Sequence, residues 1–116
     1  DVADGSFSML HVTATASGSG SSYYGVYNYN SSPSMNNVTA TATGGTFNYG
    51  VDNNSSSSSP SIRNSSITGS TNSIRNSGTS SAQVADTALG GVVTGTGFTC
   101  LGVYTTAFVA LSGGCL

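Results

Sequence analysis

The sequence predicts an all-β fold, a right-handed parallel β-helix of about four coils with three short strands in each coil. Three observations support this prediction. One block of residues returns along the chain at intervals of about 26 residues, a second block alternates with it, and no segment shows the 3.6-residue period of an amphipathic helix. Short strand-like pieces separated by turn residues are typical of a coil that stacks on itself.

The first block, SMLHVTATA at residues 8–16, returns as SMNNVTATA at 34–42 and in weaker form at 61–68 and 82–89. The second block, YGVYN at 24–28, returns at 49–53, then at 72–76 and 102–104. Residues at equal positions of stacked coils lie one above another, so apolar residues at these positions predict inward-facing columns. The columns are Met9, Met35, Ile62 and Val84; Val12 and Val38; Ala14, Ala40, Ile67 and Leu89; and Val26, Val51, Ile74 and Val103.

A corner is predicted between the methionine column and the Val12 column, because Met9 and Val12 are three residues apart and cannot alternate along one strand. Asn37 and Asn64 fall at this corner, with His11 and Asp86 at the corresponding positions. Asparagine tolerates the left-handed backbone of a tight turn and forms hydrogen bonds with nearby main chain. We therefore expect Asn37 and Asn64 to form a corner ladder.

The composition indicates one domain, residues 1–116, with coils over 7–104 and a C-terminal cap over 105–116. Charged residues make up 5% of the chain, the net charge is −2, and Arg63 and Arg75 are the only cations. This excludes the basic surface that nucleic acid or anionic lipid requires. The uncharged segment 92–111 has the length of a membrane span, but its threonines and glycines argue against membrane insertion.

Both cysteines, Cys100 and Cys115, lie near the C-terminus. We expect a disulfide that closes the cap and an extracellular or cell-surface location; two buried free thiols are the alternative. No metal site is expected, because His11 is the only histidine. The first residue is Asp1 rather than methionine, so we expect that a signal peptide or a larger N-terminal region has been removed.

The repeat S-P-S-[MI]-x-N, followed by V-T-A-T-A and Y-G-V-x-N, resembles right-handed parallel β-helix proteins of the pectate-lyase-like superfamily. The resemblance covers about residues 7–104 and rests on the corner asparagines and the aliphatic stacks. It implies the coil architecture and no particular activity. Enzymes of that superfamily cleave acidic polysaccharides with clustered carboxylates, often Ca²⁺, and a basic residue. This chain departs from that pattern, so the resemblance implies a non-catalytic member.

No catalytic residue and no cofactor are predicted. The acidic residues are Asp1, Asp4, Asp52 and Asp86. Stacking places Asp52 beside Arg75 as a surface ion pair, and Asp86 substitutes for a corner asparagine, which leaves no pair of carboxylates for acid–base chemistry. His11 has no serine and aspartate partners of a hydrolytic triad.

Two kinds of surface site are predicted. A hydroxyl array is expected on the outer face of one strand stack, and it resembles the ice-contacting faces of solenoid antifreeze proteins, although threonine is also common in exposed strands. Its members are Thr13, Thr15, Thr39, Thr41, Ser66 and Thr68. N-glycosylation sequons begin at Asn30, Asn37, Asn53, Asn54 and Asn64. Tyr23, Tyr27 and Tyr29 offer stacking surfaces for a glycan, or are scattered surface tyrosines.

The function that these features favour is an extracellular structural module: a stalk or fibre segment, or a subunit of a head-to-tail filament. The C-terminal end has a predicted cap, whereas nothing in the sequence covers the first coil, and an open β edge recruits partners. Self-association by end-to-end stacking of coils is therefore expected. The alternative function is a glycan- or ice-binding module that uses the threonine face.

Overall fold

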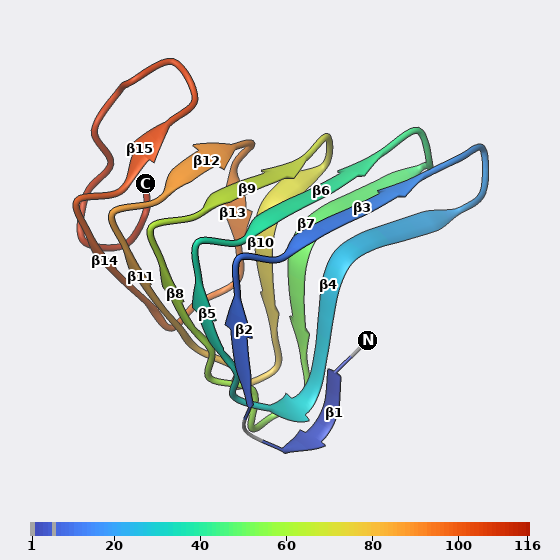
Figure 1. Ribbon diagram of the computed structural model, residues 1–116, viewed down its shortest axis with the longest axis horizontal. Coiled ribbons are helices and arrows are strands. Elements are labelled where there is room, and N and C mark those ends of the chain that lie inside the picture. The colour runs from blue at the N-terminus through green and yellow to red at the C-terminus, as the bar shows by residue number, and fades with distance from the viewer. Residues whose placement is uncertain (1, 6) are drawn as a thin grey trace.

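The computed structural model describes residues 2–5 and 7–116. These residues form no helix, and their coils are built from parallel β-strands (Figure 1). Each coil contributes one strand to each of three five-stranded sheets, A, B and C. The predicted all-β parallel β-helix with three strands per coil is confirmed. Asp1, Ser6 and the side chain of Asp4 lie outside the described part of the chain.

The strands of the three sheets follow one another along the coil axis. Sheet A contains β1 (Val2–Gly5), β4 (Ser22–Ser31), β7 (Phe47–Asn54), β10 (Asn72–Ser77) and β13 (Val93–Thr94). Sheet B contains β2 (Ser8–Leu10), β5 (Ser34–Asn36), β8 (Ser61–Arg63), β11 (Ala82–Ala85) and β14 (Phe98–Leu101). Sheet C contains β3 (Thr13–Ser17), β6 (Thr39–Thr43), β9 (Ser66–Gly69), β12 (Ala88–Gly90) and β15 (Tyr104–Thr105).

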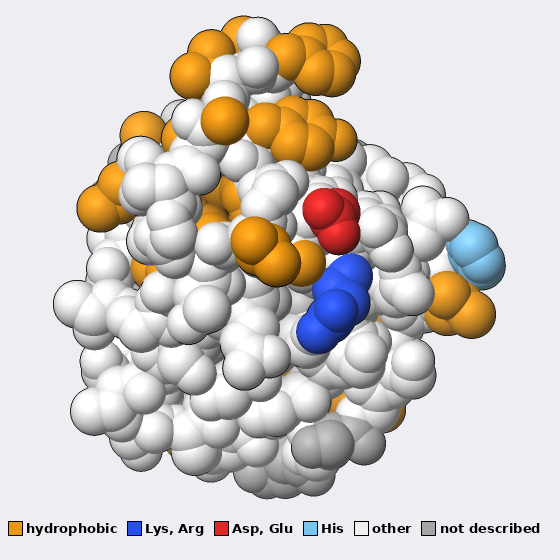
Figure 2. Space-filling view, turned by 90° about the vertical axis from the view of Figure 1, so that its left-hand side faces the viewer, with side chains coloured by type: hydrophobic (Ala, Val, Ile, Leu, Met, Phe, Trp, Pro, Cys, Tyr) orange, Lys and Arg blue, Asp and Glu red, His pale blue; other side chains and the backbone are white. Residues whose placement is uncertain are grey.

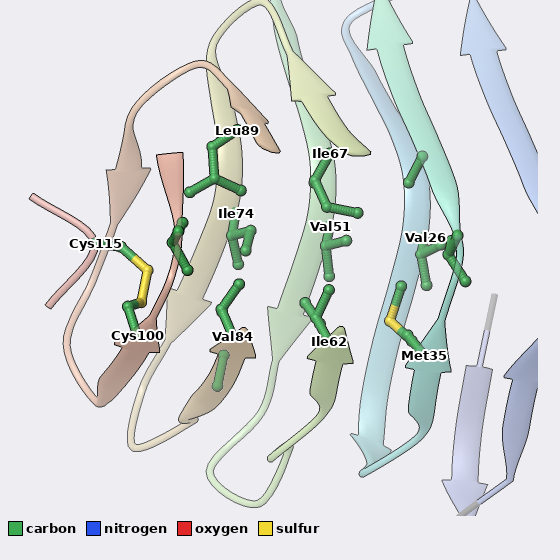
Figure 3. Close-up of a cluster of buried hydrophobic side chains, with 14 residues drawn as sticks. Val26, Met35, Val51, Ile62, Ile67, Ile74, Val84, Leu89, Cys100 and Cys115 are labelled. Carbon is green, nitrogen blue, oxygen red and sulfur yellow. A yellow bond between two sulfur atoms is a disulfide. The ribbon is translucent and has the colours of Figure 1, made fainter. Parts of the chain in front are cut away.

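The core consists of the predicted aliphatic columns, which point into the space between the sheets (Figure 3). The strand registers pair Met9 with Met35, Met35 with Ile62, and Ile62 with Val84, as expected. The column continues to Cys100, so the disulfide follows directly on the core. Burial of these side chains is the main favourable contribution to the stability of the coil.

One column prediction was wrong. Val103 was expected above Ile74, but the strand register pairs Ile74 with Val93. Val103 instead lies one residue before β15, whose Tyr104 pairs with Ala88, so Val103 follows Thr87 in the corner stack that begins with Val12. The last coil is shorter than the others, and its short strand β13 carries no Y-G-V-x-N motif that would identify it.

Sheets A and C lie against each other over part of each coil and form a thin two-layered arm, residues 13–25, 39–50 and 66–73 (Figure 1). Small residues line most of the space between the layers, with Ile67 as a larger buried side chain in β9. Ala40 and Ala42 are fully buried there, and a Cβ atom at Gly25 would lie 2.6 Å from the Gly50 carbonyl oxygen. The arm is therefore held by close approach of backbones rather than by large side chains.

The segment after β15 folds back over the last coil as a cap. Its residues pair antiparallel with β15 through Tyr104 and Ala110, and the Cys100 N–H donates to the Gly113 carbonyl oxygen at 2.7 Å. A disulfide joins Cys100 to Cys115 and ties the cap to β14. The described residues include no helix that is long and apolar enough to cross a membrane.

Candidate functional site: the open first coil and the side faces

The first coil is open along most of its edge, because β2 and β3 are terminal strands of their sheets and β1 pairs with β4 only from Asn28 to Ser31 (right-hand side of Figure 1). The side chains of Met9, Val12 and Ala14 are only partly buried, whereas their counterparts one coil later are covered almost completely. The aliphatic columns are thus buried in the second coil and half exposed in the first.

The backbone of this edge has free pairing capacity. The Thr39 N–H donates to the Val12 carbonyl oxygen at 2.9 Å. In a parallel ladder this arrangement turns the backbone groups of Ala14 toward β6 and those of Thr13 and Thr15 away from it. The N–H and C=O groups of Thr13 and Thr15 therefore face the side on which sheet C has no further strand among the described residues.

A ladder of buried asparagines runs through the interior behind sheet A. The Asn28 amide donates to Asn53 Oδ1 at 2.8 Å, and the Asn53 amide donates to Asn76 Oδ1 at 2.7 Å. Asn76 in turn donates to the Thr96 carbonyl oxygen at 2.8 Å. Every donor points toward the C-terminal end, and the ladder begins at Asn28 Oδ1, a buried acceptor without a hydrogen-bond partner among the described atoms.

At the opposite end of the coil the cap covers the edges of two of the three sheets. The Leu111 N–H donates to the Val103 carbonyl oxygen at 2.8 Å, so the cap occupies the edge of sheet C as well as that of sheet B. Exposed hydrophobic side chains gather on this end, which Figure 2 views directly; they are Val92, Leu101, Phe108, Val109 and Leu116. The two ends thus differ in kind: the first coil offers strand edges, and the last offers apolar side chains over a paired edge.

The outer face of sheet A holds a compact group of side chains, Tyr24, Tyr27, Tyr49, Asp52 and Arg75, which we call the elbow cluster. The strand bends here because two consecutive residues, Gly25 and Val26, both face inward. The tyrosines on either side of them therefore converge on the outside, with the ring centroids of Tyr24 and Tyr27 5.1 Å apart. The concave outer side of the bend is filled by these rings.

Arg75 contacts both the carboxylate and an aromatic ring of the elbow cluster. Its Nε and Nη2 atoms donate to the two carboxylate oxygens of Asp52 at 2.7 and 2.6 Å, and its guanidinium carbon lies 4.3 Å from the centroid of the Tyr49 ring. The pairing of Asp52 with Arg75 was predicted as a surface ion pair, but the Asp52 side chain is fully buried beneath the cluster. One partner of this pair is desolvated, so the two charges attract more strongly than a surface pair does.

Two members of the elbow cluster, Arg75 and Tyr27, have raised pKa values. The hydrogen bond to Asp52 raises the pKa of the Arg75 guanidinium, so it stays protonated at every physiological pH. Burial, together with the neighbouring Asp52 carboxylate, raises the pKa of the Tyr27 hydroxyl. Both carboxylate oxygens of Asp52 are engaged by Arg75, whose guanidinium lies over the Tyr49 ring.

The predicted hydroxyl array lies on the outer face of sheet C. The register pairs Thr13 with Thr39 and Thr39 with Ser66; it also pairs Thr15 with Thr41 and Thr41 with Thr68. Thr13, Thr15 and Thr39 are exposed, whereas Thr41, Ser66 and Thr68 are half-buried. The structure thus brings all six side chains into two columns, and we call this surface the Thr–Ser face.

The corner residues share one backbone conformation. His11, Asn37, Asn64 and Asp86 all have positive φ, between 47° and 56°, and Gly102 continues the column at 63°. The side chains of Asn37 and Asn64 bond to different residues: Asn37 pairs with His11 Nδ1 at 2.7 Å, and Asn64 donates to Asn36 Oδ1 at 3.1 Å. The corner is thus a column of left-handed turns whose amides bond to different neighbours.

The five sequon asparagines differ in accessibility. Asn30, Asn37 and Asn64 are exposed, and Asn54 is half-buried. Asn53 is fully buried, and both ends of its amide are used in the ladder, so the folded chain does not present it for glycosylation. Of the predicted stacking tyrosines, Tyr29 is exposed, Tyr27 belongs to the elbow cluster, and Tyr23 bonds through its hydroxyl to the Gly20 N–H at 2.9 Å.

Sequence reasoning missed the asparagine ladder and the packing of Tyr24 and Tyr49 in the elbow cluster, although it predicted the Asp52–Arg75 pair. The signal was present, since Asn28, Asn53 and Asn76 recur in the second block together with Tyr24 and Tyr49. Among the described residues, no three histidine, cysteine or acidic side chains lie close enough to hold a metal ion. Comparison of the chain with models of protein families, with curated proteins and with solved structures found no match.

Proposed function

We propose that this protein is a structural β-helix module outside the cell, a segment of a surface stalk or fibre without catalytic activity. The observation that carries the proposal is the difference between its two ends. The first coil leaves strand edges and half-exposed aliphatic residues open, whereas the disulfide-tied cap bonds to the edges of sheets B and C in the last coil. A set of coils that is capped on two sheets at one end only is suited to terminate a stack of coils.

Two further features support this role. The disulfide suits an oxidising extracellular environment, where such bonds persist. The cap occupies the edges of sheets B and C that a following copy would need for strand pairing, so a stalk or fibre segment is better supported than a head-to-tail filament subunit. As part of this proposal, the chain is a non-catalytic relative of the pectate-lyase-like superfamily with the same architecture.

End-to-end self-association through the open coil is the first prediction. The purified chain of 11.5 kDa should form a dimer through two open first coils as its concentration rises, because an unpaired strand edge recruits another. Thr15→Pro removes an N–H that faces the open edge and leaves the bonds to β6 in place, so it should restore the monomer mass. Light scattering coupled to size exclusion, with negative-stain imaging, measures this effect.

Thr15→Ala is the matched control, since it keeps the N–H and should associate like the wild type. Circular dichroism checks that both variants retain the strand signal. A wild-type chain that remains a compact monomer at the highest concentration, or an alanine variant that dissociates as fully as the proline variant, would count against the proposal.

A glycan- or ice-binding module is the second candidate function, and the in-register columns of the Thr–Ser face favour it. Thr39→Lys places a charge at the exposed centre of that face. If the face binds either ligand, the substitution should abolish the signal on a glycan array or the inhibition of ice recrystallisation. Thr99→Lys, at an exposed position of sheet B, is the control. Equal behaviour of both variants would remove the Thr–Ser face from consideration.

A further inference from the structure

We infer that the open first coil takes a second β-coil laid parallel on it, and that this partner coil carries the same repeat as the chain itself. The inference rests on the proposed function, because it names the partner of the same open end. Three arguments lead to it. Strand β1 already covers part of the edge of sheet A and sets the strand direction, the open columns present particular residues, and a second copy of the chain fits poorly in either orientation.

The direction is set by β1. This strand runs parallel to β4 with Val2 opposite Asn28 and Gly5 opposite Ser31, while the preceding part of β4, from Ser22 to Tyr27, has no neighbour on that side among the described residues. A strand that enters in line with β1 extends an existing parallel ladder. The outward-facing backbone groups of Thr13 and Thr15 accept a parallel strand in the same way.

The open columns specify the side chains of the partner. Over Met9 and Val12 an aliphatic residue is needed, because each of these columns continues as an aliphatic stack in the next coil. Over the arm small residues are favoured, since a Cβ atom at Gly25 would lie 2.6 Å from the Gly50 carbonyl oxygen and Ala14 is followed by Ala40 in its column. Residues of these types in this order are the V-T-A-T-A and Y-G-V-x-N blocks.

The elbow cluster adds an aromatic position. The rings of Tyr24 and Tyr49 are stacked, with centroids 5.6 Å apart and planes inclined by 16°, and Arg75 covers Tyr49 in turn. Tyr24 is the N-terminal member of this stack. A flat aromatic ring at the corresponding place of the partner coil would continue it, as the tyrosine of the repeat does.

A second copy of the chain fits less well in either orientation. Its last coil cannot pair with β2 and β3, because the cap bonds to the edges of β14 and β15. Its first coil would face the open coil with the strands antiparallel, so the Met9, Val12 and Tyr24 columns would not meet residues of their own kind. A parallel coil of the same repeat matches all of the columns at once.

The test adds such a coil to the full chain. A copy of residues 8–26 is joined directly before Asp1, which continues the register that places Val2 opposite Asn28. Because stacked repeats stabilise one another through their interfaces, the addition should raise Tm by at least about 5 °C. It should also slow amide exchange at Thr13 and Thr15. The matched control carries Val12→Asp and Val26→Asp within the added copy only, and we expect it to show neither effect.

An intact copy that leaves Tm and exchange unchanged, or an aspartate copy that stabilises equally, would overturn the inference. The outcome is separable from that of the proposed function. Stabilisation by the intact copy in a chain that never self-associates would contradict self-association and support the parallel partner. Self-association of the wild type without stabilisation by the copy would support the open end and contradict the parallel partner.

Discussion

Replacing Asn53 by alanine should destabilise the fold by about 4 kcal/mol, because two buried polar groups lose their partners at once and each such loss is worth about 1–3 kcal/mol. The Asn28 amide would lose its acceptor, Asn53 Oδ1, and Asn76 Oδ1 would lose its donor. Both residues are buried, so water does not replace the missing bonds without opening the coil. Urea unfolding followed by circular dichroism gives the free energy of unfolding directly.

Two other asparagines make this prediction specific. Asn28→Ala removes one ladder bond and also removes the acceptor that already lacks a partner, so it should cost about half as much as Asn53→Ala. Asn54→Ala, at a half-buried position next to Asn53, should change stability by no more than about 0.5 kcal/mol. An Asn53→Ala variant that loses no more stability than Asn28→Ala would contradict the ladder as a stabilising network.

The ladder illustrates why part of this interior could not be predicted from the sequence. Asn28, Asn53 and Asn76 recur two residues after the inward column of Val26, Val51 and Ile74, but polar residues are normally exposed, so a buried ladder was not expected. Two consecutive inward residues, Gly25 and Val26, also shift the alternation of inside and outside along β4. Period-two reasoning cannot detect such a shift, so it did not place Tyr24 on the outer face beside Tyr27.

The columns, by contrast, could be predicted because a parallel coil stacks like residues on like. Met35 lies on Met9, Ile67 on Ala40, and Val51 on Val26, as the spacing of the repeats requires. Where the repeat decays, the prediction fails. In the last coil β13 carries little of the motif, and Val103 was placed in the wrong column because its glycine and tyrosine neighbours imitate the second block.

The candidate sites divide in the same way. The Thr–Ser columns follow from the repeat, because alternate residues of a strand face outward, and the structure places all six hydroxyls there. The burial of Asp52 does not follow from the repeat. It depends on the Tyr24 and Tyr27 rings converging at the bend and on Arg75 reaching across to Tyr49, and these contacts exist only in three dimensions.

Gly69→Ala should be the other severe substitution, because the arm has no space for even one methyl group at this position. A Cβ atom at Gly69 would approach three backbone atoms, lying 2.6 Å from the Asn48 carbonyl oxygen and from the Gly50 nitrogen and closer still to the Asn72 carbonyl oxygen. Backbone atoms of neighbouring strands cannot move aside singly, so sheets A and C must separate locally. We expect a loss of about 3 kcal/mol in the free energy of unfolding.

Gly5→Ala provides the matched control for this substitution, because Gly5 also lies in a strand but a Cβ atom there would meet no atom within 4 Å. It should leave stability unchanged or raise it slightly, since alanine restricts the unfolded chain more than glycine does. Thermal and urea unfolding of the two variants measure the difference. If Gly69→Ala proved as stable as Gly5→Ala, the two layers of the arm could not be in close contact. The preference for small residues in the partner coil, which depends on that contact, would then fall as well.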